Sequence, residues 1–221
     1  MILAVLVALS GIASATGQGQ LTFYNHVPGV VDTRVYAPLT SNPYLHQIGN
    51  GPSDTPAGTT DWSSFTKIGT DTTGGPFGAT NTLGQLLGAP GTDQAESSLQ
   101  LSFPITTFRT GIAAGLVAGV TATFNNISWQ SAATMEMVAW DNSSGLYPTW
   151  TQASIAWDEG IIAAGKSGTF NIVFGNFAQP LEVLAGLQSF NLYYIPEPSP
   201  LWLAGLGIAV SLFRRFVPPA R

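Results

Sequence analysis

Short runs in which every second residue is apolar most constrain the fold of this chain. In the clearest run, Phe170, Ile172 and Phe174 alternate with Thr169 and Asn171. Side chains of a strand point alternately to its two faces, so this pattern is typical of a strand with one face buried. The runs of this kind, the first three clean and the others weaker, are 169–174, 189–194, 120–125, 135–140, 21–25, 34–37, 82–87 and 99–103. We find no amphipathic helix of ten or more residues in the body of the chain.

Turn-forming clusters separate these runs. Gly, Pro, Asn and Asp gather at 74–76, 89–91 and 141–145, where they favour tight turns and discourage continuous helices. Seven or eight short strands joined by turns predict an all-β fold, an antiparallel β-sandwich of jelly-roll-like form. The least regular stretch, 42–80, predicts long loops packed over one end.

The composition fits one folded domain between two short terminal segments. The chain has 221 residues, of which 45% are apolar, 11% aromatic and only 9% charged. So many apolar residues exclude a disordered chain. There is no cysteine, so neither disulfides nor thiolate chemistry is available. We place the β-sandwich ectodomain at 16–194.

The charge of this body is acidic. Between residues 16 and 195 eleven acidic residues face four basic ones, which are Arg34, Lys67, Arg109 and Lys166. Four basic side chains cannot neutralise a run of phosphates. We therefore expect no nucleic-acid partner.

The first fifteen residues predict a signal peptide. An apolar run at 2–9 precedes small residues that end in Ala13, Ser14 and Ala15, an A-x-A cleavage pattern. The run is shorter than the ~20 residues that a membrane span needs. No Lys or Arg precedes it, which departs from the usual pattern. The alternative interpretation is a buried N-terminal strand.

The other end combines three features in order. Pro196, Glu197 and Pro198 precede an apolar run at 201–213, which Arg214 and Arg215 follow. As a helix the run would measure about 20 Å, less than the hydrocarbon core of ~30 Å, so it spans only with help from its flanks. The arginines place their side toward the cytoplasm and the body outside. We expect a single transmembrane helix here; a plain tail anchor with a proline hinge is the alternative.

This order resembles the sorting signal of the PEP-CTERM proteins. The resemblance covers 195–221 and departs from the family in the tail 216–221, because members usually stop soon after the arginines. It implies recognition by a membrane protease of the exosortase type, cleavage near the tripeptide, and delivery to the envelope or the exopolysaccharide matrix. A looser similarity to small members of the family lies at 139–142 and 187–192.

Catalytic groups are hard to find. Asp158 and Glu159 are adjacent, and neighbours on a strand point to opposite faces, whereas the carboxylates of a glycosidase must converge on one bond. Gly160 follows them, so a solvated turn is the better interpretation. No G-x-S-x-G elbow is present. We therefore predict no catalytic residue.

Metal ligands are equally sparse. His26 and His46 lack the spacing of a zinc site. Asp54, Asp61 and Asp71 fall in the loop-rich stretch, but their wide spacing does not form a calcium loop. We expect no metal and no cofactor.

Aromatic residues supply the best candidate for binding. Trp129, Trp140, Trp150 and Trp157 lie within one stretch, together with Tyr147. Aromatic faces stack on sugar rings, but they also fill cores, which is the commoner use. Trp150, beside a proline, is the tryptophan that we expect to be most exposed, so a sugar site would comprise Trp150, Tyr147 and Trp157.

The sequence thus predicts an exported bacterial surface or matrix protein, anchored in the membrane before processing and noncatalytic. Exopolysaccharide is a candidate partner. A carbohydrate-binding module or adhesin remains an alternative, and a secreted hydrolase is a weaker one.

Overall fold

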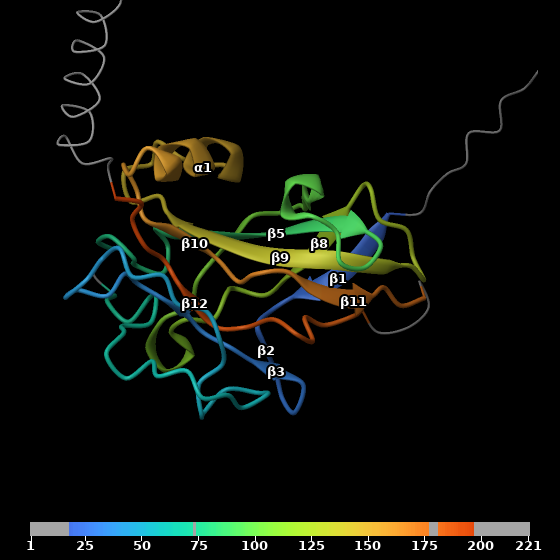
Figure 1. The fold of residues 1–221 in the computed structure, drawn as a ribbon, viewed down its shortest axis with the longest axis horizontal. Helices are drawn as coiled ribbons and strands as arrows, with labels where there is room; N and C mark the ends of the chain where they lie inside the picture. The colour runs from blue at the N-terminus through green and yellow to red at the C-terminus, as the bar shows by residue number, and fades with distance from the viewer. Residues whose placement is uncertain (1–17, 73, 177–180, 197–221) are drawn as a thin grey trace, which may run out of the picture.

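The computed structural model describes residues 18–72, 74–176 and 181–196 (Figure 1). These residues are mostly strand and loop with little helix, which confirms the predicted all-β class at this level. The strands are β1 (Gly19–Phe23), β2 (His26–Val27), β3 (Val31–Asp32), β4 (Val35–Tyr36), β5 (Thr82–Pro90), β6 (Gln100–Leu101), β7 (Thr106–Thr107), β8 (Val120–Phe124), β9 (Ala132–Asp141), β10 (Ala164–Lys166), β11 (Phe170–Val173) and β12 (Phe190–Asn191). The helical elements are α1 (Trp150–Asp158) and the 3-10 turns η1 (Glu96–Ser98) and η2 (Gly111–Ala113).

Strands β5 and β9 form the centre of the largest sheet in the described part of the chain. They pair antiparallel along nine residues, from Thr82 opposite Asp141 to Pro90 opposite Ala133. On the far side of β9, β10 and β11 pair with its two halves, and β6 and β7 pair with β5. Two-stranded pairs complete the fold, namely β1 with β8, β2 with β3, and the parallel pair β4 with β12.

Both faces of β9 are buried, which explains why its alternation is weak in the sequence. Met135 and Met137 belong to one hydrophobic cluster, which also holds Leu21 and Phe124 from β1 and β8. Val138 and Trp140 belong to a second cluster, formed with residues of α1. A strand buried on both sides needs apolar residues at nearly every position.

Helix α1 covers the second face of this sheet, as Figure 1 shows. Its start is set by Thr149, whose hydroxyl donates to the side chain of Gln152 at 2.8 Å and accepts from the Gln152 backbone N–H at 3.4 Å. Thr149 thus caps the helix, and Gln152 at the third helical position holds the capping hydroxyl, at the spacing of a capping box. Gly160, with φ of 72°, ends the helix through the left-handed conformation that glycine tolerates best.

Between β4 and β5 the described residues carry only isolated bridges, such as Tyr36 with Lys67 and Ile48 with Phe190. The long loops expected at 42–80 are therefore present. No helix among the described residues has the length and apolar character that a membrane span requires. The predicted transmembrane run at 201–213 lies outside these residues, and so does the predicted signal peptide.

Candidate functional site

Residues 193–195, directly before the Pro-Glu-Pro tripeptide, are bound to the rest of the fold. Backbone hydrogen bonds join Tyr193 and Ala164 in both directions, at 2.9 and 3.2 Å, and the Tyr194 N–H donates to the Pro43 carbonyl at 2.9 Å. Ile195 packs against the second cluster. Pro196 is exposed. The first residue of the tripeptide thus stands at the surface, directly after the last residue that the core holds.

The other residues of the predicted signals are outside the described part of the chain: Ala13, Ala15, Glu197, Pro198, Arg214 and Arg215. The first strand begins at Gly19, whose N–H donates to the Ile127 carbonyl at 2.7 Å. The strand therefore starts shortly after the predicted cleavage position.

The aromatic residues expected to bind a sugar are buried instead. Trp150 is 7% exposed and Trp157 5%, so the prediction that Trp150 is the most exposed tryptophan is wrong. Both indoles are buried because they lie on α1, and this helix turns them toward the sheet. Tyr147 is half-buried, and its carbonyl accepts a hydrogen bond from the Trp140 indole at 2.8 Å. These rings offer no flat exposed face for a sugar.

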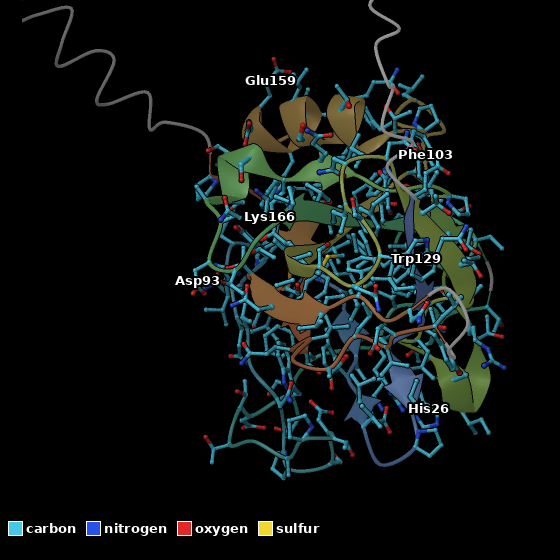
Figure 2. The ribbon with its side chains drawn as sticks, turned by 90° about the vertical axis from the view of Figure 1, so that its right-hand side faces the viewer. His26, Asp93, Phe103, Trp129, Glu159 and Lys166 are labelled. Atoms are coloured by element: carbon cyan, nitrogen blue, oxygen red, sulfur yellow. The ribbon has the colours of Figure 1, made fainter. Side chains whose placement is uncertain are left out.

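A charged cluster lies beneath these tryptophans. The Lys166 ammonium pairs with the Glu96 carboxylate and lies 5.9 and 5.6 Å from the ring centroids of Trp150 and Trp157. Figure 2 shows Lys166 below the helix and Glu159 at the helix's outer edge. The ammonium is thus shared between a carboxylate and two aromatic faces.

Glu136 is the buried member of this region. It is 1% exposed, and its Oε2 has no hydrogen-bond partner among the described residues. Burial and then the negative charge of Glu96 raise the pKa of Glu136 to about 7, while the charge of Lys166 opposes the rise. Sequence analysis did not single out this residue, since one acidic residue within a strand gives no sign of being enclosed.

A pocket of about 370 Å³ opens among the long loops. We call it the loop pocket; its lining includes Tyr36, Trp62, Phe65, Asp54, Asp61 and Lys67. The rings of Tyr36 and Trp62 stack at 4.3 Å with an interplanar angle of 2°, and Phe65 meets both edge to face. One sequence signal for this pocket was available. Trp62 and Phe65 lie three residues apart in a loop rich in Ser and Thr.

Hydrogen bonds hold the two carboxylates of the loop pocket in place. Asp54 Oδ2 accepts hydrogen bonds from the Gly51 N–H at 2.7 Å and the Ser189 hydroxyl at 2.8 Å. The Ser63 N–H holds the pKa of Asp61 below its ordinary value. Burial and the nearby Asp54 raise the pKa of Tyr36 to about 12, so its phenol stays neutral. The pocket therefore offers two carboxylates beside the half-buried Phe65, with the buried Tyr36–Trp62 stack packed against that ring.

The histidines and the third aspartate lie apart. His26 is 3.2 Å from Asp32, which also pairs with Arg34. His46 stacks on Tyr193 at 4.5 Å, and burial lowers its pKa. Asp71 lines a different pocket from the one that Asp54 and Asp61 share. Within the described ranges no group of three His, Cys, Asp or Glu side chains could hold a metal ion.

No protein-family model, curated protein or solved structure matches this chain.

Proposed function

We propose that this chain is an exported bacterial surface or matrix protein, sorted through its Pro-Glu-Pro tripeptide by an exosortase-type membrane protease. The observation that carries the proposal is the order of features after Ile195. The tripeptide follows the last core-packed residue, Ile195, directly. The apolar run at 201–213 and the arginine pair come after it. An exposed Pro196 suits a protease, since proline keeps its neighbourhood extended and cleavage requires an extended segment.

Removal of both terminal segments is compatible with this fold. The residues of the two hydrophobic clusters extend from Leu21 to Ile195. Cleavage after Ala15 and near the tripeptide would therefore leave these clusters intact. This supports a mature form that comprises the β-rich body alone, in the envelope or in the exopolysaccharide matrix.

For this body we propose a β-sandwich of jelly-roll-like form. The first cluster packs β5 and β9 against β1 and β8, which supports two β layers around one core. The long loops between β4 and β5 then lie at one end, beside β12.

We also propose that the body is noncatalytic. A hydrolase needs an acid and a nucleophile or base that reach the same substrate bond. Glu136 has the raised pKa of an acid, but at 1% exposure no substrate reaches it in this conformation. Asp158 and Glu159 are exposed at the end of α1, outside the pockets described above.

Carbohydrate binding is the second candidate, and the loop pocket favours it. The half-buried Phe65 ring beside the Asp54 and Asp61 carboxylates offers a sugar one apolar contact and acceptors for its hydroxyls. Tyr36 and Trp62 are 5% and 8% exposed and pack against Phe65 rather than against a ligand. The test is a titration of the protein with exopolysaccharide fragments of its host. Saturable binding that Asp54→Ala abolishes and Asp158→Ala leaves unchanged would support this role, and absence of binding would contradict it.

The tripeptide itself can be tested in the native host. We expect the triple variant P196A/E197Q/P198A to accumulate several-fold in the membrane fraction and to be depleted from the surface and the medium. The control is Pro200→Ala, which alters a proline outside the tripeptide and should distribute as the wild type does. Equal distribution of the triple variant and the wild type would contradict sorting through the tripeptide.

A further inference from the structure

The point at which the described chain ends lies beside α1. The Trp157 indole N–H donates to the Tyr193 carbonyl at 2.9 Å, and the two rings meet edge to face at 5.1 Å. Ile195 packs on the same cluster. Figure 1 shows this last, red part of the chain next to the helix. Any segment that follows Pro196 therefore starts at the α1 side of the molecule.

Apolar side chains are exposed on and around this helix. Ile155 on α1 is 58% exposed, Leu146 before it is 68% exposed, and Ile161 after it is 57% exposed. At about 100° per residue Ile155 points away from Ala153 and Trp157, which face the sheet. We call Leu146, Ile155 and Ile161 the α1 face.

The charge of this side is negative. Asp158 and Glu159 are exposed at the end of α1, and the last turn of the helix holds no basic residue. Lys166 is turned inward to Glu96 and the tryptophans. A surface of this charge avoids strongly anionic lipids.

The chain between the body and the apolar run is short. Only residues 197–200 separate Pro196 from the run at 201–213, so the distance from Pro196 to Leu201 is at most about 18 Å. A domain of this size has a radius of gyration of about 16 Å. If the run enters the bilayer, Pro196 stays within about 18 Å of the point of entry, a distance comparable to the radius of the body, so the exit side of the body is held close to the membrane surface.

We propose that the α1 face is the surface that rests on the headgroup region of a weakly charged, zwitterionic membrane while the chain is anchored. The inference rests on the proposed function, since it requires the run at 201–213 to enter the bilayer. The short connection makes the contact intramolecular, so a face of three apolar side chains is sufficient. Release of the body by cleavage near the tripeptide then ends the contact.

The experiment uses the absence of cysteine from the sequence. Ile155→Cys and Ile161→Cys, in the full chain, each receive a polarity-sensitive fluorophore and are reconstituted in phosphatidylcholine vesicles that carry a headgroup-level spin label. The matched control is Val30→Cys, which is 42% exposed in the turn between β2 and β3. Figures 1 and 2 place this hairpin and its His26 at the opposite end of the molecule from α1.

We expect blue-shifted emission and several-fold stronger quenching at 155 and 161 than at 30, and weaker quenching at 155 when anionic lipid is added. Equal, weak quenching at all three positions in a chain that floats with the vesicles would overturn the α1 contact and leave the anchor intact. A chain that does not float with vesicles would overturn the anchor as well. Excimer emission from pyrene at Ile155→Cys without vesicles would show that a second copy covers the face, which also overturns the proposal.

Discussion

Replacing Asn25 by alanine should lower the free energy of unfolding by about 3–5 kcal/mol. The Asn25 amide is fully buried and joins three backbone groups. Its Nδ2 donates to the carbonyls of Thr33 and Gly115 at 2.8 and 3.0 Å, and its Oδ1 accepts from the Val117 N–H at 2.9 Å. Alanine leaves all three groups without this partner in an apolar interior, which costs the desolvation of each. Urea denaturation followed by circular dichroism measures the loss.

The control is Asn125→Ala. Asn125 is exposed, and its side-chain hydrogen bond comes from the Gln18 amide, so we expect a change below about 0.5 kcal/mol. A loss at Asn25 as small as this would contradict the role of its amide as a junction between the segments at 33 and 115–117.

Replacing Glu136 by glutamine should remove a pH dependence of stability. Because the pKa of the Glu136 carboxyl is raised from 4.5 to about 7 on folding, the folded state binds its proton more tightly than the unfolded state. Stability is therefore highest below pH 4.5, falls as pH rises from 4.5 to about 7, and is constant above that range for this group. The difference corresponds to about 3 kcal/mol. Glutamine keeps the shape without the charge.

We therefore expect Glu136→Gln and the wild type to have similar stability at pH 4, and the variant to be more stable by about 3 kcal/mol at pH 8. The charged groups that act on Glu136 are Glu96 from η1 and Lys166 from β10, and both remain in the variant. Denaturation midpoints measured every half pH unit give the comparison. Glu159→Gln, at an exposed site, should parallel the wild type. Parallel curves for Glu136→Gln would show that the buried carboxyl does not titrate as described.

One strand with a single buried face could be predicted from the sequence almost to the residue. The run at 120–125 became β8, Val120–Phe124, because its outer residues are polar and its inner ones pack in the first cluster. Of the run at 189–194, only Phe190 and Asn191 form a strand. Its remaining backbone bonds go to loop residues such as Pro43, which no local pattern indicates.

The helix was missed although its signals are present. Thr149 and Gln152 have the spacing of a capping box, and Gly160 follows the last turn of the helix. The nine residues between them are a short window, and the nearby Pro148 suggested a turn. This local error placed Trp150 at the surface, whereas α1 buries it in the second cluster.

Buried polar residues could not be predicted, because their partners are distant in sequence. Asn25 meets Gly115 and Val117 about ninety positions away, and Glu136 meets Glu96 and Lys166 from separate elements. The loop pocket likewise joins Tyr36 of β4 to Trp62 of the following loop. Each arrangement follows from chain topology, which alternation of apolar residues does not encode.

Export and sorting of this chain are tested most directly by the intact mass and terminal sequences of the protein recovered from its native host. We predict the loss of residues up to about Ala15 and a new C-terminus near Pro196–Pro198. A protein that retains Arg221, in a host that possesses an exosortase-type protease, would contradict sorting through the tripeptide and leave a plain tail anchor.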